Sequence, residues 1–281
     1  MASIISTNLN SLNAQRNTSA SQMSLATSMQ RLSSGLRVNS AKDDAAGLAI
    51  AERMSAQVKG MNVAVRNAND GISLAQTAEG ALGKVGESLQ RMRELAVQAR
   101  NATNSDGDKD SLDKEFQQLS AEIKRVLGGT TFNGKAIIGS DADTLTFQVG
   151  ANTTDNDIIS ITTTDMTTDA SITAVTDTTV VIDSTTDATA LATVIDDIDG
   201  AIDRINNERA VYGATQNRFD SVISNLQVSV ENQTAARSRI MDADFASETA
   251  NLSRAQILQQ AGNAMIAQAN QLPQQVLSLL R

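Results

Sequence analysis

The 281-residue chain contains no histidine, no cysteine and no tryptophan, and aromatic residues make up only 2% of it. Without histidine and cysteine there can be no thiol nucleophile, no disulfide, no Cys/His zinc site and no mechanism that uses histidine as an acid or base. With one tyrosine and five phenylalanines, the chain must bury mainly Ala, Leu, Ile, Val and Met. These absences exclude most enzyme classes, and our prediction for the chain is that it is not an enzyme and uses no cofactor and no metal.

Basic residues are missing from the middle of the chain. Between Lys135 and Arg204 there is no Lys or Arg, and residues 136–203 contain 13 Asp and no Glu. No basic stripe with interleaved aromatics occurs, so we predict no nucleic-acid partner. The N-terminus lacks a charged and then apolar leader, and no run approaches ~18 apolar residues, so we expect neither a cleaved signal peptide nor membrane insertion.

Proline is also nearly absent, and long helical patterns fill most of the sequence. Apolar residues three and four apart predict one helix over about 44–100 and a shorter one over about 112–126, which two glycines end. A heptad pattern over 191–230 predicts a coiled coil with two polar interruptions. Because such helices need partners along their whole length, the pattern predicts a mainly α protein, a coiled-coil rod of long helices.

Weaker versions of the same spacing lie at both ends of the chain, and we predict that these N- and C-terminal helices pair at one end of the rod. Many of their seam positions hold Ala, Gly or Ser, so neither terminus can offset its ordering entropy alone. We expect each to order only against copies of the same chain. The predicted assembly seam comprises Leu25, Met29, Leu32, Leu36, Leu258, Met265, Leu272, Val276, Leu279 and Leu280.

Only the middle of the chain carries β-strand signals. Asn133-Gly134 is typical of a hairpin turn, apolar and polar residues alternate over 144–149, and residues 158–161 indicate another short strand. Over 165–189 the composition narrows to Thr, Asp, Ala and Val, which predicts an exposed, weakly structured β-rich tip.

Two motifs have competing interpretations. Residues 80–84, GALGK, suggest a phosphate loop, but a Walker A motif has four residues between its glycines and a Ser or Thr after its Lys, so nucleotide binding is not favoured. The aspartates of the middle segment could bind Ca²⁺, but no loop has alternating acidic ligands, a glycine and a closing Glu. A solvated acidic surface is the favoured interpretation.

Three long motifs resemble bacterial flagellin: residues 1–12, residues 33–50 (SSGLRVNSAKDDAAGLAI) and the closing run 240–281. Taken without the resemblance, residues 33–50 are a joint between two helices, in which Ser40 or Asp43 caps the second helix. The resemblance covers about 1–150 and 190–281. The segment between is too short for the inserted outer domains of larger family members.

The resemblance implies a structural subunit that self-assembles into the helical filament of the bacterial flagellum and folds its termini on assembly. Residues 1–42 with 243–281 would form an inner coiled-coil layer. Residues 43–150 with 187–242 would form a helical layer that includes a short β-hairpin region, and 151–186 an acidic, Thr-rich variable tip. The alternatives are a hook-filament junction protein, another secreted coiled-coil effector or adhesin and, last, an enzyme.

The resemblance also implies partners and a location. These are identical subunits in a homopolymer, the flagellar export apparatus, a flagellin chaperone, and the filament cap and hook-junction proteins, with the filament lying outside the cell. A further implied partner is the host's flagellin-sensing Toll-like receptor. Helical spacing places Arg91, Leu95 and Gln98 on one face, and by resemblance Glu115 is their acidic partner. Without the resemblance, the stretch is an ordinary surface helix in which Arg91 pairs with Glu94.

Overall fold

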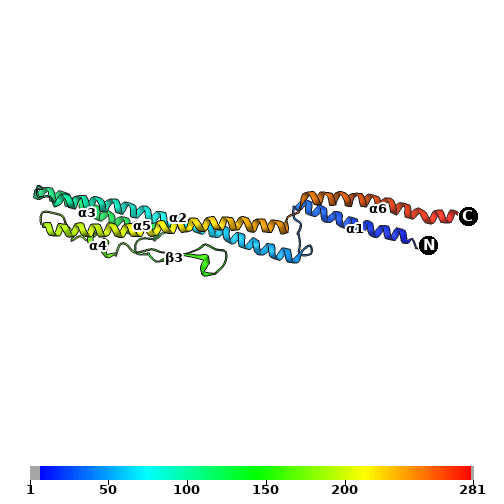
Figure 1. Ribbon diagram of the computed structural model, residues 1–281, viewed down its shortest axis with the longest axis horizontal. Coiled ribbons are helices and arrows are strands. Elements are labelled where there is room, and N and C mark those ends of the chain that lie inside the picture. Colours follow the sequence, from blue (N-terminus) through cyan, green and yellow to red (C-terminus); the bar gives the residue numbers. More distant parts are fainter. Residues whose placement is uncertain (1–6, 280–281) are drawn as a thin grey trace. The chain divides into compact units, whose positions relative to one another are not determined.

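The computed structural model describes the backbone of residues 7–279 and the side chains of residues 7–271. It divides into two compact units: unit 1 holds the described residues up to Ala56 and from Glu231 onward, and unit 2 holds Gln57–Val230. The helices are α1 (Leu9–Ser34), α2 (Ala45–Ala99), α3 (Asp106–Gly129), α4 (Ala170–Thr176), α5 (Ala188–Met241) and α6 (Phe245–Leu279) (Figure 1). The strands are β1 (Thr131–Phe132), β2 (Lys135–Ala136), β3 (Thr144–Gln148) and β4 (Ile158–Thr162), with a 3₁₀ turn, η1, at Asp155–Asp157. The predicted mainly α fold is confirmed.

Helix α2 has the predicted bounds, and α3 ends at the predicted glycines but begins before the predicted pattern. Helix α2 starts just after Asp44, whose carboxylate accepts a hydrogen bond from the backbone N–H of Gly47 at 2.8 Å. Helix α3 starts with a capping box, in which Ser105 and Asp108 each accept from the other's backbone N–H at 3.3 and 3.0 Å. It ends at Gly129, the second of the two glycines that predicted its end.

The core of unit 2 is built from α2, α3 and α5. Every seventh residue of α5 from Leu191 to Phe219 lies at most 1% exposed: Leu191, Ile198, Ile205, Tyr212 and Phe219. This periodic burial confirms the predicted coiled-coil seam. The core residues that α2 and α3 contribute include Leu82, Leu89, Met92, Leu95, Phe116, Ile123 and Leu127.

Two small antiparallel ladders join this core. Asn133 and Gly134 form the loop between β1 and β2, and both have positive φ, 50° and 81°, as the turn predicted from the Asn-Gly pair requires. Strand β3 pairs with β4. Ile159 and Ile161 of β4 point into the core at 3% and 2% exposure, so the predicted strands are confirmed.

The prediction of an exposed, weakly structured β-rich segment over 165–189 is wrong. The segment contains helix α4, and four of its six large apolar side chains are at most 1% exposed in the core of unit 2: Met166, Ile172, Val175 and Ile182. Ser120 of α3 also donates to the backbone oxygen of Thr176 at 3.0 Å. The physical reason is that a few well-placed apolar residues suffice to anchor a short segment, although its average composition is polar.

Three aspartates of this segment face solvent and also stabilise turns of the backbone. Asp165, Asp177 and Asp183 each accept hydrogen bonds from the backbone N–H and the hydroxyl of the threonine two residues later. These threonine hydrogen bonds lower the pKa of each of the three carboxyls. The repeated Asp-x-Thr pattern is therefore a structural device that composition alone did not reveal.

Candidate functional site

In unit 1, α1 and α6 run side by side, α1 in blue and α6 in orange to red in Figure 1. Their contact is lined by small side chains, so the helices can approach closely. The buried positions include Ser11, Thr18, Ser28, Ala255 and Ala269, all at most 6% exposed. At the closest point, a Cβ added to Gly262 would lie 2.4 Å from Oγ1 of Thr18. The pairing of the terminal helices predicted from the sequence is confirmed.

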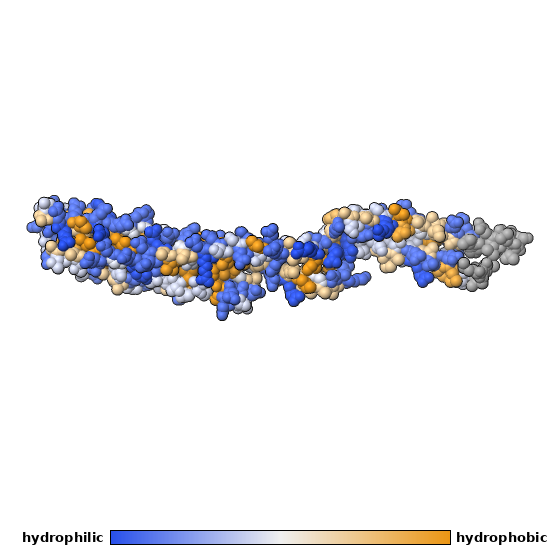
Figure 2. Space-filling model, in the orientation of Figure 1, coloured by the Kyte–Doolittle hydropathy of each residue, from blue (hydrophilic) through white to orange (hydrophobic). Residues whose placement is uncertain are grey.

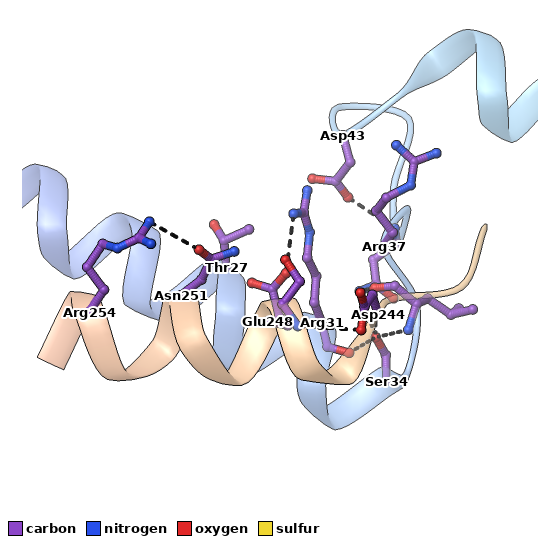
Figure 3. A network of polar contacts seen from close by, with 12 residues as sticks. Thr27, Arg31, Ser34, Arg37, Asp43, Asp244, Glu248, Asn251 and Arg254 are labelled. Carbon is purple, nitrogen blue, oxygen red and sulfur yellow. Dashed lines mark hydrogen bonds and ion pairs between the residues drawn. The ribbon is translucent and has the colours of Figure 1, made fainter. Parts of the chain in front are cut away.

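Polar side chains fix the register of this pair. Near the start of α1, the amide nitrogen of Asn8 donates to the backbone oxygen of Ala269 at 2.7 Å, and the hydroxyl of Ser11 contacts Oδ1 of Asn270 at 2.8 Å. Near its other end, Arg31 approaches Glu248, which is 7% exposed, at 3.8 Å (Figure 3). The two helices are therefore joined by polar contacts at both ends of a contact surface that holds few apolar atoms.

Eight large apolar side chains of the pair point away from its interface. They are between 48% and 66% exposed: Leu9, Leu12, Met23, Met29, Phe245, Ile257, Leu258 and Met265. Figure 2 shows apolar side chains gathered in patches among polar ones at the surface. We call these eight residues the exposed apolar set. A groove of about 430 Å³ between α1 and α6, lined among others by Asn13, Asn17, Leu258 and Met265, adjoins it.

The predicted assembly seam falls into three groups in the structure. Met29, Leu258 and Met265 belong to the exposed apolar set, whereas Leu25, Leu32 and Leu36 are half-buried. Leu272, Val276 and Leu279 lie on α6 beyond the described side chains, and Leu280 lies outside the described residues. Sequence reasoning missed the other five members of the exposed apolar set because it followed a single seam on each helix. A second apolar phase on the same helices would have indicated them.

The two links that lead into α1 and α6 are bonded to each other within unit 1. Leu36 and Asp242 form an antiparallel bridge, and the guanidinium of Arg37 donates twice to the backbone oxygen of Ile240, at 3.2 and 2.6 Å. Gly35 takes the left-handed conformation, φ 72°, that ends α1. Val38, Ala51 and Met241 form a small buried apolar cluster next to these bonded links.

The link between α1 and α2 is further held by a carboxylate. Asp43 accepts hydrogen bonds from the hydroxyl of Ser40 at 3.0 Å and from the backbone N–H groups of Ser40 and Asn39 at 2.9 and 3.1 Å. These contacts, the Ser40 hydroxyl first, lower the pKa of Asp43. The sequence proposed Ser40 or Asp43 as the cap of α2, but Asp43 instead closes the turn before it, and Asp44 serves α2.

The predicted receptor residues lie in unit 2, and the structure brings the two charged ones, Arg91 and Glu115, together with Glu94. Nε of Arg91 lies 2.8 Å from Oε1 of Glu115 and its Nη1 lies 2.9 Å from Oε2 of Glu94, and these carboxylates raise the pKa of the guanidinium. Gln98 is exposed, but Leu95 is 0% exposed within the core. Leu95, which helical spacing places on the same face as Arg91, is therefore covered in the single chain, because its helix turns that position into the core of unit 2.

Neither a metal site nor a membrane span stands out in the described part of the chain. Over residues 7–279, no three acidic side chains gather in a way that could hold a metal ion. None of the helices there combines the length and the apolar character that crossing a membrane requires.

Comparisons with known proteins match the chain from both ends. Residues 5–143 match the model of the bacterial flagellin N-terminal helical region, and residues 195–280 match that of the C-terminal helical region. Flagellin of Halalkalibacterium halodurans is 46% identical over 99% of this chain and 100% of its own length. Flagellin of Xenorhabdus nematophila is 44% identical, with 100% of each chain covered.

A solved structure shares the fold at much lower sequence identity. It is that of a proposed flagellar hook-associated protein of Vibrio parahaemolyticus, with a TM-score of 0.58 and 13% identity over 71% of this chain and 100% of its own. At that identity the likeness concerns the fold alone.

Proposed function

The chain belongs to the bacterial flagellin family, and from that premise we propose that its terminal helix pair joins neighbouring subunits through the exposed apolar set. As a flagellin, the chain is a structural subunit of the bacterial flagellar filament, an extracellular homopolymer, and the junction-protein alternative is not favoured. A structural subunit of this kind needs no catalytic group. The remaining question is which surface of the subunit contacts its neighbours in the polymer.

The single observation that carries the proposal is that α1 and α6 bury small side chains between them and expose large apolar ones. Their interface within the chain takes the small residues, while eight large apolar side chains are left at least 48% exposed. Fully burying one such side chain contributes about 1.5–3 kcal/mol. A surface of this kind on a monomer indicates a protein partner. Identical subunits are the partner that a homopolymer supplies.

Assembly-coupled ordering follows from the same surface. We infer that residues 1–42 with 243–281 form the inner layer and gain most of their stability only between subunits, where the ordering entropy is offset. Residues 43–150 with 187–242 would form the surrounding helical layer, and 151–186 the variable segment. The seam residues Leu272, Val276, Leu279 and Leu280 would complete the inner contacts.

A charge placed in the exposed apolar set tests the proposal. In Ile257→Asp, a position that is 66% exposed in the single chain, the concentration needed for polymerisation should rise at least about tenfold, since burying a charge costs more than burial of Ile gains. Circular dichroism melting should be unchanged. The matched control is Gln256→Asp, which adds the same charge at the neighbouring exposed polar position. Equal polymerisation of both variants and the native chain, by sedimentation and electron microscopy, would refute the proposed surface.

Recognition by the flagellin-sensing Toll-like receptor is a second proposal, supported by the exposed group of Arg91, Gln98 and Glu115. Leu95 would act only by supporting the helix from within. A receptor reporter assay should show reduced activity for Arg91→Ala and Glu115→Ala. The control is Arg125→Ala, since Arg125 pairs with Glu122 at 2.6 Å in an exposed position on α3. Activity unchanged in all three variants would exclude the site.

Other proposed partners act before or at the ends of the filament. They are the export apparatus, a flagellin chaperone at the C-terminal segment, and the cap and hook-junction proteins, with export by the flagellar route. We also propose that the intact filament escapes the receptor because neighbouring subunits cover the Arg91 face. The reporter assay with monomer and sheared filament tests this, and equal specific activity would contradict it.

A further inference from the structure

Asn133-Gly134 is the one Asn-Gly sequence in the chain, and it forms the entire loop between β1 and β2. Both residues are exposed. A Cβ built on Gly134 would meet no heavy atom within 4 Å apart from its chain neighbours, so no other part of the chain crowds the glycine. The loop thus presents a side-chain carboxamide next to an unhindered backbone amide.

Within the described residues, the backbone N–H of Gly134 donates no hydrogen bond, and the carboxamide of Asn133 makes none. The three Asn-Ser sequences of the chain differ, because in each the serine N–H is engaged. The bonds are Ser11 N–H to Oδ1 of Asn8 at 3.1 Å, Ser40 N–H to Oδ2 of Asp43 at 2.9 Å and Ser105 N–H to Oδ2 of Asp108 at 3.0 Å.

Two of those carboxamides are also held in place. The side-chain nitrogen of Asn39 donates to Oγ of Ser34 at 2.8 Å, and that of Asn104 donates to the backbone oxygen of Gln98 at 2.6 Å. An amide nitrogen that is hydrogen-bonded, facing a carboxamide that is tethered, must break these contacts before the two can react. Asn133 and Gly134 have no such contacts to break.

We propose that Asn133 is a site of spontaneous deamidation in the folded protein. The nitrogen of Gly134 attacks Cγ of Asn133 and gives its proton to water, while the bond from Cγ to Nδ2 breaks and Nδ2 takes up a proton from water and leaves as ammonia. Water then opens the resulting succinimide at one of its two carbonyls, which gives either aspartate or isoaspartate. No oxidant or reductant takes part, and water is the only co-reactant.

The product changes the hairpin in two ways. Each event adds one negative charge, and the isoaspartyl form adds a methylene to the backbone of a two-residue loop. The pairing of Thr131 with Ala136 and of Phe132 with Lys135 depends on that loop length. Ile137 and Ile138, which follow directly, are 2% and 0% exposed in the core of unit 2. Modified chains should therefore accumulate with age and have a looser hairpin.

Peptide mapping of the whole protein tests this inference. Native protein and protein unfolded in urea are held in mildly alkaline buffer, digested with trypsin and followed by mass spectrometry, with a zero-time sample to correct for conversion during digestion. Peptide 126–135 carries Asn133, and peptides 38–42 and 101–109 carry Asn39 and Asn104 as internal controls.

We expect peptide 126–135 to gain the acid mass at similar rates in native and unfolded protein, and to accept methyl groups from a protein isoaspartyl methyltransferase. The two control peptides should convert at least about tenfold more slowly in the native protein than in urea, since their amides must first open. The variant Asn133→Asp should show no mass gain in peptide 126–135. Conversion of that peptide in urea but not in the native protein, or in neither, would overturn the inference.

Discussion

The core of unit 2 and the terminal helix pair of unit 1 use the same three-and-four spacing in opposite ways. In unit 2 the seam positions bury the largest side chains, with Phe116, Tyr212 and Phe219 at 0% exposure. In unit 1 the buried seam holds residues such as Thr18 and Ala255, and the large side chains face outward. Spacing therefore shows that a helix has a partner, and side-chain size shows which face carries most of the stability.

Replacing a phenylalanine by alanine in each region should give the largest difference in unfolding free energy between the two. Phe219 packs edge-to-face on Phe147 at 5.5 Å and covers Gly71, so Phe219→Ala should cost about 3–5 kcal/mol of unfolding free energy. Phe245, which is 56% exposed, should lose less than about 0.5 kcal/mol in Phe245→Ala. Urea denaturation of the monomers measures both.

Polymerisation should depend on Phe245 although the stability of the monomer does not. Phe245→Ala should weaken polymerisation, since its ring belongs to the exposed apolar set. Equal losses of monomer stability for the two variants would show that unit 1 is stabilised within the chain as strongly as unit 2.

The second largest effect should be a difference in the rates at which trypsin cleaves the termini and unit 2. Trypsin should cut the monomer first at Arg16 and Arg254, which are exposed, and then at Arg31 and Arg37, removing roughly residues 1–40 and 243–281. Cleavage within unit 2 should be about tenfold to a hundredfold slower, because its sites open only with the core. In polymer the termini should be protected. Termini that resist trypsin in the monomer would contradict assembly-coupled ordering.

The close approach of α1 and α6 gives a third, smaller effect. In Gly262→Ala the new methyl group would collide with Thr18 Oγ1, which itself donates to the backbone oxygen of Ala14 at 2.9 Å. We expect a loss of about 1–3 kcal/mol in unit 1 and weaker polymerisation. Adding Thr18→Ala should restore both. The control Gly200→Ala, in open space on α5, should be neutral or slightly stabilising. Failure of the double variant to recover would place the strain elsewhere.

The smallest expected effect concerns pH. Burial alone would raise the pKa of Asp169, but hydrogen bonds from Arg204, at 2.8 Å, and from the backbone N–H of Ser171 outweigh it and lower the pKa. A lowered folded pKa contributes stability above the unfolded value of about 3.9, and this is lost as pH falls through the folded value. Arg204 also pairs with a second carboxylate, that of Glu208, at 3.1 Å.

Asp169→Asn keeps the cap of α4 and removes the charge. It should therefore cost about 1 kcal/mol near neutral pH and nothing in strong acid. Asp199→Asn is the control, because its pair with Arg93 has both side chains about half exposed and should contribute little at any pH. Thermal melting across the acid range compares them, and a constant difference between native chain and Asp169→Asn would disprove the assignment.

Much of the helical fold could be predicted from periodicity. The expected helix over 44–100 is α2 at Ala45–Ala99, and the heptad over 191–230 lies within α5. Both rely on local spacing repeated over many turns, which sequence reveals directly. The Asn133-Gly134 turn was equally clear, since positive φ at both positions favours that pair.

Two of the misses have a common physical cause. Leu95 and the α4 segment were assigned to the surface because sequence spacing cannot say which of two faces meets the core. Ile172 and Val175 are buried through contacts with helices distant in the chain, and Leu95 turns inward although Arg91, one turn earlier, is exposed. Burial at such positions is a tertiary property. The five members of the exposed apolar set outside the predicted seam were missed because only one apolar phase was followed on each helix.

The hydrogen bond from Asn8 to Ala269 spans 261 residues of sequence. A contact of such high contact order closes late, since the loop entropy of bringing its ends together must be overcome first and rises by about 0.6 kcal/mol with each doubling of loop length. Helix α1 is synthesised first, yet its partner α6 is synthesised last. For the whole time that the chain is being made, α1 therefore has no partner in its own molecule, and unit 1 can close only when the chain is nearly complete.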